Sequence, residues 1–246
     1  MAAAGVRRNV LKGMRRWLFG VVLGCGVAAL AYWRRALTLD GALAAVGVGG
    51  VVFARGGGAG VAALLAFFAS SSALSRLGER RKRQSPLAQA KGARRDAWQV
   101  LANGGVATLC LAVGGRAGRG GFVGALAAAG ADTWATELGL LARGRPRLVT
   151  TLKPVQAGTS GGVTAEGLLA TLAGASVVAL AWRVFGGHGS VWRGVAAGMA
   201  GSLVDSLLGA TVQALYRCPD CEQLTEEPVH GRCGAATNLV RGQRWL

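Results

Sequence analysis

The carboxylates of one apolar segment, and the glycine-rich loop that follows it, carry the clearest chemical signal in this sequence. Asp132 and Glu137 lie near the end of an Ala/Gly/Leu-rich stretch, and a lysine and small residues follow as Lys153-Pro-Val-Gln-Ala-Gly-Thr-Ser-Gly-Gly162. Ionisable groups at the edge of a membrane span are costly and therefore mark a functional site. The backbone N–H groups of such a loop, together with one lysine, suit a bound phosphate.

A second acidic group lies further along the chain, in the segment Asp205-Ser-Leu-Leu-Gly-Ala-Thr-Val-Gln213. A carboxylate in so apolar a segment needs a partner, which Lys153 or a Mg2+ ion could supply. Mg2+ is typically held by a few carboxylates and phosphate oxygens, so we expect Asp132, Glu137 and Asp205 to hold it. The predicted catalytic residues are Asp132, Glu137, Lys153 and Asp205, the predicted phosphate-binding residues are Gly158, Thr159, Ser160, Gly161 and Gly162, and the predicted supporting polar residues are Asn103, Thr133, Thr136, Ser206 and Gln213. The alternative is that these groups only hydrogen-bond one helix to another.

The tail of the chain carries a second kind of site. Cys218, Cys221, His230 and Cys233 have the spacing C-x2-C-x8-H-x2-C. Four such ligands suit a tetrahedral zinc ion, and a closed set of four predicts a structural site. The alternative is a set of free cytoplasmic thiols.

Long apolar runs between clusters of charge predict that helices position these residues in a membrane. The chain of 246 residues is 52% hydrophobic and only 16% charged, and several runs approach the roughly 20 residues that cross a bilayer. We expect an all-α transmembrane bundle of six or seven helices with a short, zinc-knuckle-like tail. The predicted organisation is a basic N-terminal tail (1–16), a transmembrane bundle (17–215) with cytoplasmic loops 76–96 and 139–161, and a Cys/His tail (216–246). The predicted spans are 17–33, 38–54, 57–75, 97–115, 121–138, 163–186 and 191–215.

The formal net charge of +17 favours contact with a membrane rather than with nucleic acid, because the charges are clumped beside apolar runs. Eight basic residues lie between Arg76 and Arg95, and five lie in the first sixteen residues. The positive-inside rule and anionic lipid headgroups account for such clusters. We therefore expect a multi-pass protein of the cell's inner or plasma membrane. Three spans before Arg76 would place the basic N-terminus outside, and the sequence leaves that conflict open.

The chain resembles the integral-membrane proteins grouped as domain of unknown function 92, which include vertebrate transmembrane protein 19 and the plant phytyl-phosphate kinase. The resemblance covers about residues 35–246. It is carried by Asp96-Ala-Trp-Gln-Val-Leu-Ala-Asn-Gly-Gly105, Asp132-Thr-x-Ala-Thr-Glu-x-Gly139, Pro146-Arg-Leu-Val-Thr-Thr151, Lys153-Pro-x3-Gly-Thr-Ser-Gly-Gly162 and Asp205-Ser-x2-Gly-Ala-Thr-x-Gln213. Ala131 stands where a glycine is usual in that family, and Gln156-Ala157 where prolines are common.

The resemblance implies a kinase that transfers a phosphoryl group from a nucleoside triphosphate, such as CTP, to an isoprenoid monophosphate. Two other classes of function stay open at this point. One is a transporter or lipid-handling protein without chemistry, since polar residues within spans are equally expected there. The other is an assembly factor whose zinc tail recruits a partner.

Overall fold

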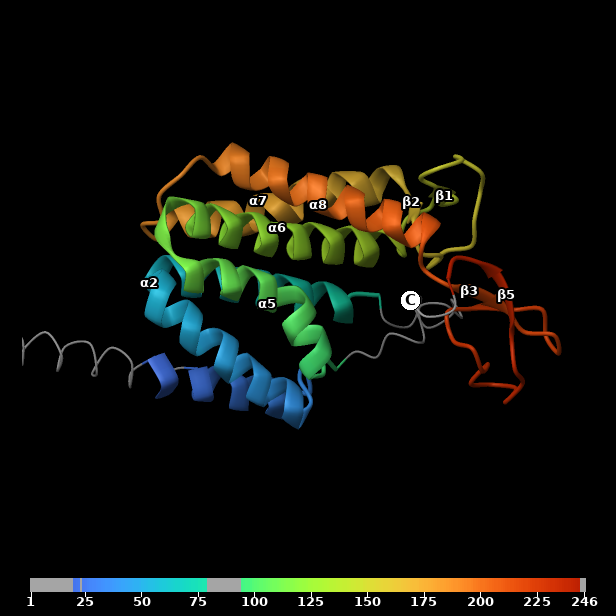
Figure 1. Ribbon diagram of the computed structural model, residues 1–246, viewed down its shortest axis with the longest axis horizontal. Coiled ribbons are helices and arrows are strands. Elements are labelled where there is room, and N and C mark those ends of the chain that lie inside the picture. The colour runs from blue at the N-terminus through green and yellow to red at the C-terminus, as the bar shows by residue number, and fades with distance from the viewer. Residues whose placement is uncertain (1–19, 23, 79–93, 244–246) are drawn as a thin grey trace, which may run out of the picture.

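The computed structural model describes residues 20–22, 24–78 and 94–243, and this part of the chain is mainly helical (Figure 1). The predicted basic tail (1–16) and most of the predicted 76–96 loop lie outside the described residues. A helix over Gly20–Trp33, in which residue 23 is not described, comes first. The named helices are α2 (Leu39–Arg76), α5 (Ala97–Val113), α6 (Gly115–Gly139), α7 (Ala165–Val184) and α8 (Val191–Thr211).

Helix α2 folds back on itself at Gly57, which has φ 58° and ψ −151°. Glycine adopts this left-handed conformation without a steric penalty. A Cβ atom added to Gly60 would lie only 3.0 Å from Val52 Cγ1. In a straight helix, residues eight apart lie about two turns apart along the axis and would not touch in this way. The two arms of α2 therefore diverge from this kink, which falls between the predicted segments 38–54 and 57–75.

Both ends of α2 return to the same end of the bundle. The backbone N–H of Thr38 donates to the carbonyl of Arg95 at 3.0 Å, and the Arg76 guanidinium donates to the carbonyl of Arg34 at 2.7 Å. We call this end the sheet end, because the small sheets of the protein also lie there. The opposite end, with Gly57 and the α5–α6 and α7–α8 turns, is the kink end (Figure 1).

The sequence also accounts for where the other helices begin. Asp96 caps α5 by accepting from the backbone N–H of Gln99 at 2.8 Å, and Thr164 caps α7 by accepting from Gly167 at 3.0 Å. Such caps satisfy N–H groups that have no partner within the helix. Helices α5 and α6 are joined through Gly114, whose φ of 79° allows an abrupt turn.

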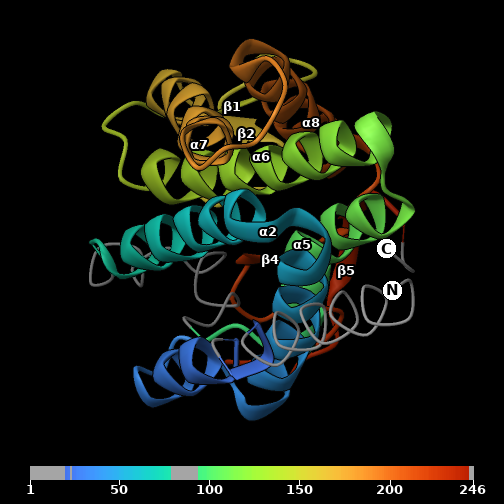
Figure 2. The ribbon, with the colours of Figure 1, turned by 90° about the vertical axis from the view of Figure 1, so that its left-hand side faces the viewer.

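Helix α6 is the centre of the bundle and packs against α2, α5, α7 and α8. Figures 1 and 2 show α6, α7 and α8 together on one side, with α2 and α5 on the other. Small residues allow the helices to approach closely. A Cβ atom on Gly174 would lie 2.7 Å from the carbonyl oxygen of Gly130, and one on Gly198 would lie 2.9 Å from Ala127 Cβ. This is the packing expected between helices in an apolar medium.

Two helices of the described chain, α2 and α7, are both long and apolar enough to cross a membrane. The helical architecture of the prediction is confirmed, while the number of six or seven spans stays a prediction.

The all-α prediction missed two small antiparallel sheets. Strand β1 (Arg147–Leu148) pairs with β2 (Gly162–Val163), and β3 (Leu215–Arg217) lies between β4 (Leu224–Thr225) and β5 (Asn238–Arg241). The first sheet closes the base of the glycine-rich loop, and the second organises the tail.

Candidate functional site

One cavity at the sheet end brings together residues from three separate parts of the chain. Asp132 of α6, Asp205 of α8 and the loop 158–162 all line it, and its volume is about 140 Å³. Thr136, Ser206 and Gln213 also line this cavity, as do Thr171 and Ser202, which the sequence analysis did not include among the supporting residues. We call it the acidic pocket. Two carboxylates, several hydroxyls and one amide therefore face a shared space.

The glycine-rich loop is held flat against the end of α8. A Cβ atom on Gly161 would lie 2.5 Å from the backbone nitrogen of Ala210, so no side chain fits there. Gly161 also has φ 79°, which favours glycine. A turn in which Gly162 N–H donates to the Thr159 carbonyl at 2.9 Å tightens the loop.

Thr159 gives this loop an unused polar group. Its side chain is only 6% exposed, it lines the acidic pocket, and its hydroxyl oxygen has no hydrogen-bond partner among the described residues. Buried hydroxyls normally have a partner, and leaving one without costs free energy. The loop is therefore suited to a ligand that supplies a hydrogen bond to Thr159.

Four of the predicted site residues lie away from the acidic pocket. Glu137 accepts a hydrogen bond from Ser75 of α2. Thr133 donates to the Ala129 carbonyl of its own helix at 2.8 Å. Lys153 is exposed, and Asn103 lines a different cavity.

The four predicted ligands of the tail meet as the spacing predicted. Their ligand atoms all lie within 4.8 Å of one another, with Cys218 and His230 buried and Cys221 and Cys233 exposed. The Cys221 Sγ–His230 Nδ1, His230 Nδ1–Cys233 Sγ and Cys233 Sγ–Cys221 Sγ distances are 3.4, 3.3 and 3.6 Å. Ligands of a tetrahedral zinc ion, at about 2.3 Å for sulfur and 2.1 Å for nitrogen, would lie roughly 3.6–3.8 Å apart. The group could thus hold a metal ion such as zinc.

The thiols of this cluster differ in acidity. Burial opposes ionisation of Cys218, but hydrogen bonds from the backbone of Cys221 and Asp220 lower the pKa of its thiol to about 7. The side-chain contact with Cys221 raises the pKa of the Cys233 thiol to about 11, and partial desolvation by the neighbouring groups adds to that shift.

The tail is attached directly to the glycine-rich loop. The guanidinium of Arg241, on β5, donates to the carbonyl of Ser160 at 2.8 Å and to the carbonyl of Gly209 at 3.2 Å. The Ser160 hydroxyl donates to the Glu226 carboxylate. Burial lowers the pKa of the Arg241 guanidinium, and the nearby Glu226 carboxylate opposes this shift. Sequence reasoning missed Arg241 and Glu226, because nothing in their spacing points to the loop.

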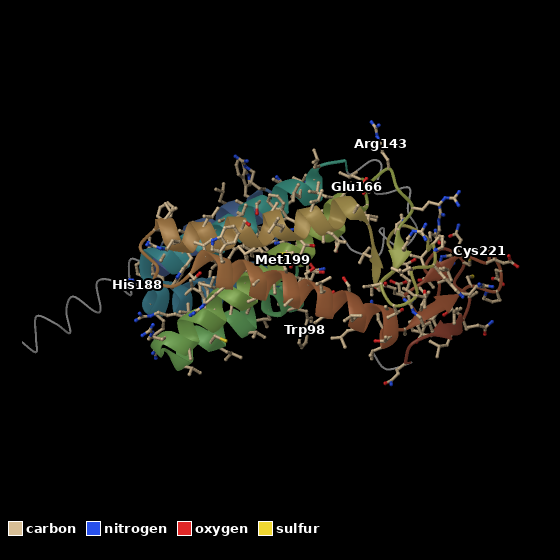
Figure 3. All side chains as sticks on the ribbon, turned by 90° about the horizontal axis from the view of Figure 1, so that it is seen from above. Trp98, Arg143, Glu166, His188, Met199 and Cys221 are labelled. Carbon is tan, nitrogen blue, oxygen red and sulfur yellow. The ribbon has the colours of Figure 1, made fainter. Side chains whose placement is uncertain are left out.

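Figure 3 shows the resulting division of the molecule. Cys221 and Arg143 lie at the sheet end, and His188 lies at the kink end, far from both. His188 follows α7, and its carbonyl accepts from the indole of Trp182 at 3.0 Å. Both candidate centres of chemistry, the acidic pocket and the Cys/His cluster, are therefore at one end of the bundle.

Comparisons with known proteins show which family this chain resembles in sequence. Protein PGR of Arabidopsis thaliana is 38% identical over 244 residues, which covers 87% of this chain and 84% of that protein. An uncharacterised membrane protein of Methanocaldococcus jannaschii is 32% identical over 206 residues (82% of this chain, 85% of that protein), and one of Synechocystis is 32% identical over 229 residues (87% and 86%). No solved structure matches the chain significantly. The model of a family described as integral membrane protein DUF92 matches residues 22–246, and the chain belongs to this family of integral membrane proteins.

Proposed function

We propose that the protein is a membrane-embedded kinase that transfers a phosphoryl group from a nucleoside triphosphate, such as CTP, to an isoprenoid monophosphate. One observation carries the proposal. Two carboxylates from different helices, Asp132 and Asp205, share a cavity with a glycine-rich loop whose buried Thr159 hydroxyl has no hydrogen-bond partner within the described part of the chain. Phosphoryl transfer depends on positioning and on charge stabilisation, and these residue types supply both.

The residues of the acidic pocket also fit Mg2+. Hard oxygen ligands are what this ion prefers, and it usually binds one or two carboxylates together with phosphate oxygens. Asp132 and Asp205 would hold it, while Ser206 and Thr136 offer further oxygens in the same cavity. When bound, the ion would neutralise part of the charge on the phosphates.

In the proposed reaction, an oxygen of the acceptor phosphate forms a bond to the terminal phosphorus of the donor. The bond from that phosphorus to the bridging oxygen breaks, and the nucleoside diphosphate leaves. The backbone of the 158–162 loop and the Thr159 hydroxyl would orient the transferred group. Lys153 lies on the exposed loop that β1 and β2 support, where it would contact the outer phosphates of the donor.

The proposal is tested with purified full-length protein, Mg2+, radiolabelled CTP or ATP, and phytyl or farnesyl monophosphate. We expect a labelled lipid diphosphate that does not form when Mg2+ is removed. If no diphosphate is formed with either lipid or donor, the kinase is excluded. Lipid binding without turnover would then indicate a lipid-handling protein.

We propose that the metal of the tail is structural zinc, because the ligands Cys218, Cys221, His230 and Cys233 form a closed set of four. Elemental analysis of purified protein should find one zinc ion per chain. Replacing Cys218 and Cys221 by serine should remove it, whereas Cys25→Ser and Cys110→Ser should not. A wild-type protein that contains no zinc after purification without chelators would contradict this assignment.

We also propose that the sheet end faces the cytoplasm. The 76–95 segment carries eight basic residues and the 139–161 loop carries four more, against Arg55, Arg116, Arg119, Arg183 and Arg193 among the described residues of the kink end. The positive-inside rule favours the more basic side as the cytoplasmic one. A cytoplasmic nucleotide can reach the acidic pocket only from that side.

Single cysteines at Leu152 and Ser190, in a background without the native cysteines, test this orientation because both positions are exposed and they lie at opposite ends. An impermeant thiol reagent should label Ser190→Cys in intact cells, and Leu152→Cys only after the membrane is opened. Labelling of Leu152→Cys in intact cells would reverse the orientation and remove the kinase mechanism with it.

A further inference from the structure

The kink end of the bundle holds a cavity that is separate from the acidic pocket. It lies between the start of α6, the end of α7 and the start of α8, and its volume is about 670 Å³. His188, which Figure 3 shows at this end, lines it, and none of its lining residues also lines the acidic pocket. We call it the basic cavity, because four arginines line it: Arg116, Arg119, Arg183 and Arg193.

No carboxylate within the described ranges balances these arginines. No aspartate or glutamate of those ranges lines the basic cavity, nor the neighbouring cavity of about 680 Å³ that Arg55 and Arg119 share. The carboxylates that the structure describes all lie at the sheet end or in the tail: Asp40, Asp96, Asp132, Glu137, Glu166, Asp205, Asp220, Glu222, Glu226 and Glu227. Arginines gathered in one place repel one another, so the arrangement favours an anion that comes from outside the chain.

The two helices that begin at the kink end add to this positive charge. Helices α2, α5 and α7 begin at the sheet end, and each has a side-chain cap. Helices α6 and α8 have no side-chain cap and no acidic residue in the first turn. Arg116 and Arg193 stand in those first turns, where a positive charge opposes the helix dipole. An anion in the basic cavity would offset this repulsion.

The wall of the basic cavity between α7 and α8 is fixed by Trp182. Its indole donates to the His188 carbonyl at 3.0 Å, and its own carbonyl accepts from the N–H of Gly187 at 2.9 Å. The Trp182 ring packs against Phe122, with 5.5 Å between the ring centroids. The loop that joins α7 to α8 is therefore tied to the helices beneath it, and the cavity has a preformed wall.

Exposed apolar side chains adjoin the arginines of the basic cavity. Val184 and Phe185 follow Arg183 and are 75% and 65% exposed, and Trp192 precedes Arg193 and is 76% exposed. Aromatic side chains at the ends of membrane helices typically lie at the level of the lipid head groups. A soluble anion would satisfy the arginines alone, whereas a lipid would also cover the apolar side chains beside them.

We infer that the basic cavity binds the phosphodiester head group of an anionic diacyl phospholipid, with the acyl chains along the exposed apolar side chains of α7 and α8. The two non-bridging oxygens of a phosphodiester accept hydrogen bonds from the planar guanidinium groups of arginine. The rest of the head group must carry no positive charge, because the arginines would repel it. This lipid is a bound ligand and not the acceptor of the proposed reaction, whose phosphate must be free to react, so the inference does not depend on that reaction.

The test is native mass spectrometry of the full-length protein in detergent, titrated with four probes that separate chains, phosphate and charge. Dioleoyl phosphatidylglycerol is an anionic diester, dioleoyl phosphatidylcholine has the same chains and a zwitterionic head, dioleoylglycerol has no phosphate, and glycerol 3-phosphate has no chains. We expect one tight phosphatidylglycerol site per chain, at least about tenfold stronger than binding of the other three probes. Equal binding of phosphatidylcholine would show that the arginines do not select the head, and equal binding of glycerol 3-phosphate would indicate a soluble ligand. Either result would overturn the inference.

A pair of double variants locates the site. Arg119→Gln with Arg193→Gln removes two exposed arginines of the basic cavity and should weaken the tight site at least about tenfold. Arg143→Gln with Arg145→Gln removes the same charge from exposed positions at the sheet end, and binding should stay within about twofold of the wild type. Equal weakening in both double variants would indicate attraction to the net charge alone and would overturn the inference.

Gly120→Phe blocks the basic cavity without changing any charge. Gly120 lines the cavity, and a Cβ atom added there meets nothing within 4 Å, so the helix accommodates a side chain at this position. The variant should lose the tight phosphatidylglycerol site, and it decides the question if the arginine variants do not fold. Unchanged binding in folded Gly120→Phe protein would show that the lipid binds elsewhere and would contradict the assignment.

Discussion

Replacing Asp132 or Asp205 by asparagine should lower kcat for phosphoryl transfer by about 10²–10³-fold, which is typical for the loss of one preorganised electrostatic group. Each substitution keeps the size of the side chain and removes one of the two charges that face the acidic pocket. The rate of diphosphate formation, measured at saturating donor and lipid, gives the effect directly. The Mg2+ concentration that gives half-maximal activity should rise in the same variants, because each would hold the ion with one carboxylate fewer.

Glu166→Gln provides the matched control for this experiment. Glu166 lies in the first turn of α7, at the same end of the bundle, but it does not line the acidic pocket. The substitution should leave kcat within about twofold of the wild type, as expected for a surface change away from the reacting groups. Normal turnover by Asp132→Asn and Asp205→Asn would show that the chemistry occurs elsewhere.

Helical spacing explains which of the predicted catalytic residues the structure brings together. Asp132 and Thr136 are four residues apart, and both line the acidic pocket. Glu137 is five residues from Asp132, or roughly 140° around the helix, so it faces another neighbour. That neighbour is α2, where Ser75 donates to it. The sequence could predict the carboxylates but not which helices would surround α6.

The long apolar stretch of α2 shows a similar limit. The segment Arg55-Gly-Gly-Gly58 marks an interruption between two apolar runs, and the predicted spans break there. The direction of the chain after the interruption depends on Gly57 taking the left-handed conformation, which a glycine permits but does not require. Packing against α5, α6 and α7 decides it, and packing is not visible in a hydropathy pattern.

The tail also has one feature that the sequence predicts and one that it does not. The ligands of the Cys/His cluster were predictable because metal coordination fixes their type and spacing. The contact of the tail with the acidic pocket was not, because it depends on the register in which β5 pairs with β3. That register places Arg241 opposite Leu215, beside the end of α8. The sequence alone treats the tail as a separate unit, whereas the structure attaches it to the loop at Ser160.

Replacing Arg241 by methionine should loosen the glycine-rich loop and thereby impair the acidic pocket. The change keeps the unbranched stem of the side chain but removes the guanidinium, which donates to the carbonyls of Ser160 and Gly209. Hydrogen bonds from a charged group contribute about 1.5–3 kcal/mol, so the loop should open roughly ten- to a hundredfold more often. Hydrogen–deuterium exchange of peptides covering 156–164 measures this opening without reference to activity.

The same experiment links the metal of the tail to the loop. Strand β5 holds Arg241 in place, and a tail of about thirty residues is too small to fold stably on its own core, so it should depend on its metal. Chelation of the metal should therefore raise exchange in 156–164 as Arg241→Met does, while Arg241→Met itself should retain the metal. Arg217→Met, an exposed arginine of the same sheet, is the control and should leave the loop protected. In a kinase assay, Arg241→Met should raise KM for the nucleotide more than it lowers kcat, because the loop binds the donor but Asp132 and Asp205 are untouched. Loop protection that is unaffected by both Arg241→Met and chelation would show that the tail does not position the loop.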